Sequence, residues 1–219
     1  MNRQLLIFTS IICTLALIFI AVSLIFFKKV SFQDVDPIKI KEETKNNPYL
    51  GDNKAKNTII EFMDFKCPYC KKFHEDTFYS INNKFIKKGD VEYRIVNASI
   101  LGDDSLIASR AAYAVYIHAP NEYWAFHNNL FSLQKGGHEK TFSTSKIDKE
   151  IEKLNISSSK IKKIKKEYKT QNSKSWNLAK EDQEMYKKYK NKYVPSVYVN
   201  GKFIKDPYSI EEVEKYLNL

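Results

Sequence analysis

The sequence has few cysteines, only three in 219 residues. Cys13 lies in an apolar run near the N-terminus, so the polar remainder of the chain holds only Cys67 and Cys70. No second cysteine pair is present to complete a four-cysteine zinc site. A zinc site made of Cys67, Cys70 and His74, with the spacing C-x2-C-x3-H, remains a minor alternative.

A nucleic-acid-binding motif is also lacking, although the formal net charge is +10. The positive charge is spread along the chain, which is compatible with a position near an anionic membrane surface. The Lys-rich segment 157–190 keeps Ile161, Ile164 and Tyr168 at helical spacing. A basic amphipathic helix of this kind can bind a membrane surface. We favour the alternative that it is a solvated helix face.

Residues 5–27 contain no charged side chain. As a helix they span about 34 Å, against about 30 Å for the hydrocarbon core of a bilayer. No small-x-small cleavage site follows the run, so we predict an uncleaved single-pass anchor over residues 1–29. A cleaved signal peptide is the alternative. The polar segment 30–57 is expected to be a stalk.

The stretch 58–72, TIIEFMDFKCPYCKK, predicts a strand, a turn and then a helix with Cys67 and Cys70 at its start. This arrangement is typical of a thioredoxin-like redox site. Pro68 suits the first helical position, which leaves Cys67 at the N-cap, where free backbone N–H groups stabilise a thiolate. We therefore expect Cys67 to be the exposed nucleophile and Cys70 the buried resolving thiol. A purely structural disulfide is the alternative.

Charge at the two ends of the apolar run does not decide its orientation, because Arg3 lies on one side and Lys28 and Lys29 on the other. The redox motif decides the orientation instead. A tethered C-x-x-C domain with no other cysteine fits an oxidising space. We therefore expect a cell-membrane protein whose catalytic domain is extracytoplasmic.

Residues 58–219 predict one α/β domain. His127 lies on an aromatic-rich helix face, so we expect it to be a satisfied structural histidine. Val194-Pro195 comes directly before a strand and an Asn-Gly hairpin turn, which suggests a cis peptide bond. The pattern predicts strands at 91–96, 196–199 and 202–204, and helices at about 68–88, 105–116, 122–133, 147–154 and within 157–190.

The chain resembles the DsbA family of thiol:disulfide oxidoreductases, especially its membrane-anchored Gram-positive, BdbD-like branch. The resemblance covers essentially all of 58–219. It implies a thioredoxin-like α/β fold with a helical insertion, at about 100–190, between the C-x-x-C helix and the cis-Pro strand. The matching pieces are Glu61–Cys70, Ala111-Ala112, Tyr123-Trp124 to Leu130-Phe131, and Val194-Pro195 before Asn200-Gly201.

The resemblance also implies roles. Cys67 and Cys70 would be catalytic. Glu61, matching the family's buried acid, would tune the redox pair together with Pro68 and Tyr69. Substrate would bind beside the cis peptide bond, at Val194 and Pro195. The sequence departs from the Gram-negative enzymes in having Pro-Tyr rather than Pro-His between the cysteines.

The implied activity is a protein dithiol oxidase without a cofactor. It would donate its disulfide to exported proteins with free thiols. A DsbB-type membrane quinone reductase would be its partner for re-oxidation, and the protein would be a monomer that binds no nucleic acid. Two alternatives stay open: a disulfide reductase or isomerase on the same fold, and a membrane-tethered binding module with a structural disulfide.

Overall fold

The structure is a computed structural model that describes residue 15 and residues 34–134 and 141–219. The chain divides into two units, Met1–Gln33 and Asp34–Leu219, and the second contains the fold described below. The predicted membrane anchor at 5–27 lies outside the described residues, apart from residue 15. Within the described part of the chain, no helix is long and apolar enough to cross a bilayer.

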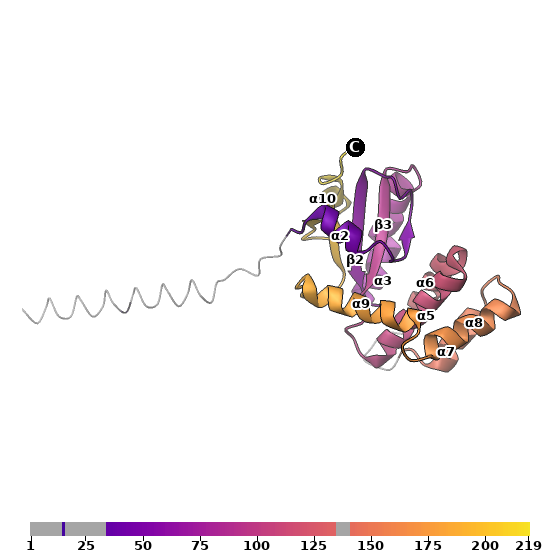
Figure 1. Ribbon diagram of the computed structural model, residues 1–219. Helices are drawn as coiled ribbons and strands as arrows, with labels where there is room; N and C mark the ends of the chain where they lie inside the picture. The colour runs from indigo at the N-terminus through magenta and orange to yellow at the C-terminus, as the bar shows by residue number, and fades with distance from the viewer. Residues whose placement is uncertain (1–14, 16–33, 135–140) are drawn as a thin grey trace, which may run out of the picture. The chain divides into compact units, whose positions relative to one another are not determined.

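The core of this unit is one five-stranded sheet with the strand order β1-β3-β2-β4-β5 (Figure 1). β2 and β3 run parallel, whereas every other neighbouring pair is antiparallel. Every residue of β3 is buried, so both faces of the sheet are covered there. The strands are β1 Tyr49–Leu50, β2 Asn57–Met63, β3 Val91–Asn97, β4 Ser196–Val199 and β5 Lys202–Phe203.

The cysteine pair opens a helical run that follows β2. The run matches the predicted helix at 68–88, but two π-helical segments, η1 and η2, interrupt its α-helical turns. π-Helical turns inside helices are often found at functional sites. The first of them begins at His74, one turn after Cys70. The segments are α3 Pro68–Phe73, η1 His74–Phe78, α4 Tyr79–Ile81 and η2 Asn82–Ile86.

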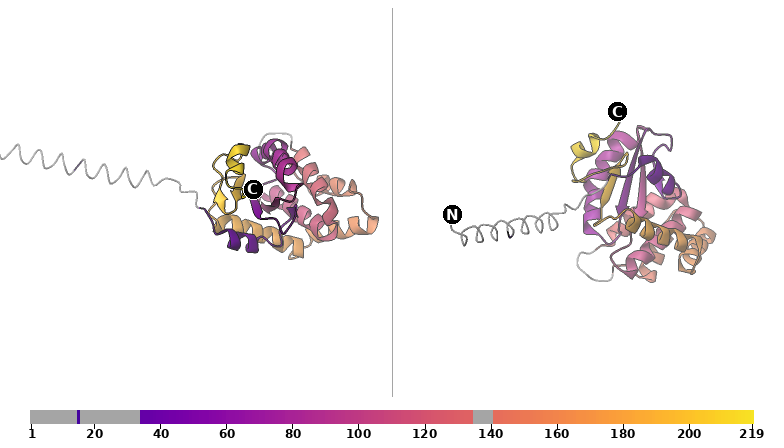
Figure 2. Two further views of the ribbon diagram at one scale, coloured as in Figure 1. Left: turned by 90° about the horizontal axis from the view of Figure 1, so that it is seen from above. Right: turned by 60° about the vertical axis from the view of Figure 1, so that its left-hand side comes forward.

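A helical insertion separates β3 from β4, as predicted. Figures 1 and 2 show α5 to α8 gathered beside the sheet, and α9 returns to contact β3. In α8 the apolar residues Ile164 and Tyr168 are buried, so the lysines form a solvated face, as we favoured. The helices are α5 Asp103–His118, α6 Tyr123–Ser132 (after the 3-10 turn η3 Pro120–Glu122), α7 Thr144–Glu152, α8 Ser158–Lys169 and α9 Lys174–Lys188.

The predicted stalk at 30–57 is wrong for residues 34–57, which belong to the folded unit. Asp36 caps α2 (Pro37–Glu43), and β1 pairs with β3. The buried Asn47 side chain donates a 2.8 Å hydrogen bond to Asp182 on α9. The sequence hid this because the segment is held by polar bonds and a two-residue strand, which leave no apolar periodicity.

Both ends of the folded unit meet at the β4–β5 hairpin, at the end of the sheet opposite the cysteines. The Val35 N–H donates a 2.8 Å hydrogen bond to the Gly201 carbonyl oxygen. A Cβ at Gly201, whose φ is +79°, would lie 2.3 Å from the Val35 oxygen, so only glycine fits. The Asn200 amide donates 2.8 Å to the Tyr216 carbonyl, just after α10 (Ile210–Glu214).

Candidate active site

Cys67 is the N-cap of α3, and Pro68 is its first helical residue, as predicted. The Cys70 thiol and the backbone N–H groups of Cys70 and Tyr69 lower the pKa of the Cys67 thiol, against the opposing effect of its burial. These donors stabilise the thiolate, which is the reactive form of a cysteine. Both cysteines are free thiols, so the geometry is that of the reduced pair.

Cys70 has the opposite character. Its side chain is completely buried, and burial, followed by the Cys67 sulfur and the Glu61 carboxylate, raises the pKa of its thiol well above the usual value. The Asp64 backbone N–H lies 3.5 Å from the Cys70 sulfur. One turn of helix therefore separates a thiol that readily loses its proton from one that keeps it.

Cys67 is less exposed than predicted, with 4% of its surface accessible. The chain before Pro195 covers it, since the thiol donates a 3.4 Å hydrogen bond to the Val194 carbonyl oxygen. Access comes from a hollow of about 670 Å³ that reaches Cys67. The exposed side chains of Tyr69, Ile100 and Leu101 give this hollow an apolar lip.

The Val194–Pro195 peptide bond is cis, as predicted. A second hollow, of about 350 Å³, lies beside it and is lined by Tyr69, Tyr193, Pro195 and Tyr208 among others. The Tyr208 hydroxyl donates a 3.1 Å hydrogen bond to the Tyr69 carbonyl oxygen. The sequence analysis missed Tyr208, which lies far along the chain in a turn without a motif.

Glu61 is fully buried on β2, as the resemblance implied. Its Oε2 atom accepts a hydrogen bond from the Tyr93 hydroxyl and lies 2.8 Å from Nε2 of His74. The zinc alternative does not fit, because His74 faces Glu61. Over the described residues, no group of three or more histidine, cysteine or acidic side chains could hold a metal ion.

His127 is fully buried among aromatic rings, as predicted, with its ring centroid 5.3 Å from that of Phe65. Its Nε2 atom has no hydrogen-bond partner, so the prediction of a satisfied histidine is wrong. Burial, and then the nearby His74, lower the pKa of His127 well below its usual value. His127 is therefore neutral at neutral pH.

The sequence analysis also missed Asp64, which ties the loop after β2 to α5. Its carboxylate accepts the backbone N–H groups of Lys66 and Leu101, at 2.8 and 2.9 Å, and the Ser105 hydroxyl. The Lys66 ammonium continues the link with a 2.8 Å ion pair to Asp104. The position of Asp64, at the end of the buried strand before the cysteines, was the available signal.

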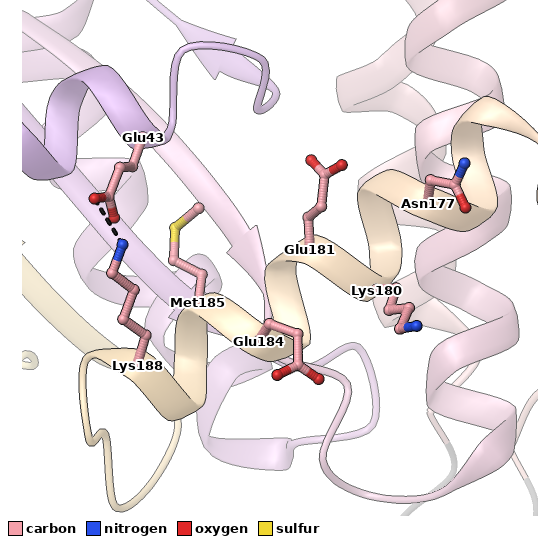
Figure 3. Close-up of a pocket in the computed structure, with 7 residues that line it drawn as sticks. All are labelled: Glu43, Asn177, Lys180, Glu181, Glu184, Met185 and Lys188. Carbon is pink, nitrogen blue, oxygen red and sulfur yellow. Dashed lines mark hydrogen bonds and ion pairs between the residues drawn. The ribbon is translucent and has the colours of Figure 1, made fainter.

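A further hollow, of about 700 Å³, lies over α9 and has no cysteine among its lining residues. Figure 3 shows that its charged side chains come mainly from α9, with one ion pair of 2.7 Å between Lys188 and Glu43 of α2. The reactive chemistry therefore belongs to the cysteine end of the sheet. The lining residues are Glu43, Asn177, Lys180, Glu181, Glu184, Met185 and Lys188.

Known proteins share this fold and sequence. The family model described as Thioredoxin matches residues 43–218. Disulfide bond formation protein D of Bacillus subtilis (strain 168) is 31% identical over 193 residues, which cover 84% of this chain and 81% of the relative. The chain belongs to the Thioredoxin family, as does its relative, disulfide bond formation protein D. It is a thioredoxin-fold thiol:disulfide oxidoreductase of the DsbA and BdbD kind, and the alternative of a non-enzymatic binding module is wrong.

Solved structures agree with this assignment. The crystal structure of oxidised BdbD from Bacillus subtilis superposes with a TM-score of 0.73 at 29% identity, covering 79% of this chain and 91% of that one. The thiol-disulfide exchange protein alpha-DsbA2 from Wolbachia pipientis, at 19% identity and a TM-score of 0.68, shares the fold over 83% of this chain and 92% of its own. The predicted thioredoxin-like fold with a helical insertion is confirmed.

Proposed function

We propose that this oxidoreductase is a dithiol oxidase that donates a Cys67–Cys70 disulfide to exported proteins. The observation that carries the proposal is the contrast between the two thiols, since the pKa of Cys67 is lowered and that of Cys70 is raised. A stabilised Cys67 thiolate favours the reduced enzyme, and a couple whose reduced form is stabilised is oxidising.

The reaction begins with the oxidised enzyme. A substrate thiolate attacks the Cys67 sulfur, the Cys67–Cys70 bond breaks, and Cys70 leaves with the electron pair and takes up a proton. A second substrate thiolate then attacks the substrate sulfur of the mixed disulfide and expels Cys67 as a thiolate. The substrate loses two electrons to the cysteine pair. The backbone N–H groups at the start of α3 make Cys67 the better leaving group.

Substrate binding is assigned to Val194 and Pro195. An extended peptide could pair with the Val194 backbone as an added strand, and this would bring its thiol to Cys67. Ile100, Leu101 and Tyr193 are partly exposed around Cys67 and would contact apolar side chains of the substrate.

Tuning of the pair is assigned to three further residues. Pro68 starts the helix and so directs its free N–H groups at Cys67. Tyr69 contributes one of those backbone N–H groups, while its side chain is 64% exposed. Glu61 lies close enough to Cys70 for its charge to raise the pKa of the Cys70 thiol. We assign to Glu61 the exchange of a proton with Cys70.

The location belongs to the same proposal. Residues 5–27 would anchor the protein in the cell membrane with the domain outside the cytoplasm, where substrates are exported proteins. A DsbB-type membrane quinone reductase would re-oxidise the pair, and the protein would act as a monomer. The name of the Bacillus subtilis relative, disulfide bond formation protein D, supports the oxidising direction.

The test is oxidation of a reduced two-cysteine peptide by the oxidised full-length protein in detergent. We expect one peptide disulfide for each enzyme disulfide, no reaction with Cys67→Ser, and a trapped mixed disulfide with Cys70→Ser. Equilibration with glutathione gives the direction. A couple as reducing as thioredoxin would replace the proposal with the reductase alternative, and faster repair of scrambled disulfides than formation of new ones would replace it with the isomerase alternative.

A further inference from the structure

Four polar side chains form a buried cluster behind Cys70: Glu61 on β2, His74 on η1, Tyr93 on β3 and His127 on α6. His74 is 8% exposed, and the other three residues are completely buried. Oε2 of Glu61 lies 2.8 Å from Nε2 of His74, and the ring centroids of His74 and His127 are 4.5 Å apart. The cluster thus continues inward from the redox pair across four elements.

Three atoms of this cluster are buried without a hydrogen-bond partner: Oε1 of Glu61, Nδ1 of His74 and Nε2 of His127. Buried polar atoms are nearly always hydrogen-bonded, so three orphans in one cluster need an explanation. An aromatic residue at 74 or 127 would fill the same space without leaving a nitrogen unpaired. Packing alone therefore does not account for two histidines.

The cluster reaches the surface at its far end. Nδ1 of His127 lies 3.4 Å from Oδ1 of the next residue, Asn128, which is exposed on α6. Ionisable or polar groups therefore follow one another from Cys70 through Glu61, His74 and His127 to solvent. In each imidazole one nitrogen lies beside a polar neighbour, Glu61 for His74 and Asn128 for His127, and the other nitrogen is unpaired. A ring with two nitrogens can take up a proton on one and release a proton from the other.

We propose that His74 and His127 relay protons between solvent at Asn128 and Glu61, and so supply and remove the proton of Cys70. A water, or a rotation of either ring, joins Nδ1 of His74 to Nε2 of His127. The proposal rests on the proposed function in one respect, that Cys70 is the buried leaving thiol.

The relay conserves atoms and charge. When Cys70 leaves as a thiolate it takes the proton of Glu61, and Nε2–H of His74 reprotonates that carboxylate. His127 passes its Nε2 proton to Nδ1 of His74, and solvent protonates Nδ1 of His127. On re-oxidation the same steps run backward, so that Cys70 becomes a thiolate able to attack the mixed disulfide at Cys67.

Two tyrosines are the other titratable groups that face the cluster among the described residues. Tyr93 donates its hydroxyl hydrogen to Glu61, and the ring centroid of Tyr123 lies 6.0 Å from that of His127. Burial raises the pKa of both tyrosines well above the usual value, so both keep their protons at neutral pH. The tyrosines therefore keep the cluster in place, and the histidines carry out the proton exchange.

The test isolates the step that needs Cys70 to lose its proton. The reduced full-length protein in detergent is mixed with oxidised glutathione, quenched in acid at intervals and analysed by mass spectrometry. Attack by Cys67 forms a mixed disulfide with glutathione, and attack by Cys70 then resolves it. We expect His127→Phe and His74→Phe to slow resolution about tenfold at pH 7 and to leave the first step unchanged.

The pH profile separates a relay from a packing role. In both variants the resolution rate should rise about tenfold per pH unit between pH 6 and 9, because hydroxide must then remove the Cys70 proton. The parent should show a flatter profile. His118→Phe, a change at the partly exposed end of α5 that lies outside the cluster, is the matched control.

Resolution within twofold of the parent rate, with the parent's pH profile, would overturn the relay. A second measurement needs no variant: the parent's resolution step should slow more than twofold in heavy water, and a ratio near one would also overturn it. Oxidation of the two-cysteine peptide is scored separately, so the oxidase proposal can stand while the relay fails.

Discussion

The Cys67 thiol and the Val194 carbonyl oxygen, 127 positions apart in the chain, lie 3.4 Å from each other. The start of α3 and the strand entry at β4 therefore form one surface. Under the proposed function, a substrate that pairs with the backbone at Val194 would arrive with its thiol at the Cys67 sulfur. The chemistry and the binding of substrate can thus be tested separately.

Alkylation should distinguish the two thiols. Because the pKa of Cys67 is lowered and that of Cys70 is raised, iodoacetamide should modify reduced Cys67 well below the pH of half-reaction of a free cysteine, about 8.5. Peptide mapping across pH 5–9 gives the site and rate. Cys70 should react only in denaturant, and faster labelling of Cys70 in the folded protein would contradict the assignment.

The apolar lip should contribute to binding but not to thiol reactivity. Ile100 and Leu101 are 43% and 41% exposed, so replacing both by serine should raise KM for a peptide with apolar flanks by about thirtyfold, at roughly 1 kcal/mol for each side chain. A serine at position 101 keeps the backbone N–H that donates a hydrogen bond to Asp64. Ile38→Ser, on exposed α2, is the control, and an unchanged KM would remove the lip from the binding site.

The free energy of unfolding should depend on pH through the buried carboxyl group of Asp182. Burial raises its pKa to about 7, although Tyr113, Asn97 and Asn47 donate hydrogen bonds to it. In the unfolded chain the same carboxyl titrates near about 3.9. Between these values the folded protein holds a proton that the unfolded chain has lost, so this contribution is complete below about pH 4 and is lost as the pH rises through about 7.

Urea unfolding of the parent and of Asp182→Asn at pH 4 to 8 measures this effect. The free energy of unfolding of the parent relative to the variant should fall by several kcal/mol over that range, at about 1.4 kcal/mol per pKa unit. Glu184→Gln, an exposed change on the same helix, should show no such trend. A constant difference would mean that Asp182 stays ionised in the fold.

Membrane attachment can be tested in intact cells. If residues 5–27 are an uncleaved anchor and the domain is extracytoplasmic, protease added to protoplasts should remove residues 34–219 while a cytosolic marker survives. Deleting residues 5–27 should leave the domain in the soluble fraction. A domain protected from protease in intact protoplasts would contradict the proposed orientation.

Local rules were enough to predict the backbone geometry around the cysteine pair. Pro68 fixed the start of the helix, and the Asn-Gly turn after Pro195 fixed the hairpin, because each of these residues has a narrow backbone preference. Glu61 came from the family resemblance, and the structure shows it buried. Such features are encoded within a few residues of the chain.

The remainder depended on contacts between distant segments. Nothing in the sequence near His74 shows that it faces Glu61 rather than the cysteines, because the π-helical turn that begins there sets its direction. The partial cover over Cys67 comes from Val194. The buried Asn47 amide finds its hydrogen-bond acceptors on distant segments, at Ile95 on β3 and Asp182 on α9.

The β4–β5 hairpin has a practical consequence. Val35 is bonded to Gly201, and Tyr216 to Asn200, so the first and last segments of the folded unit lie together at the end of the sheet remote from Cys67. A short peptide could join residue 219 to residue 34 in a circularly permuted chain. Held by either terminus on a bead, the unit would keep its cysteines directed away from the support and open to a protein in solution.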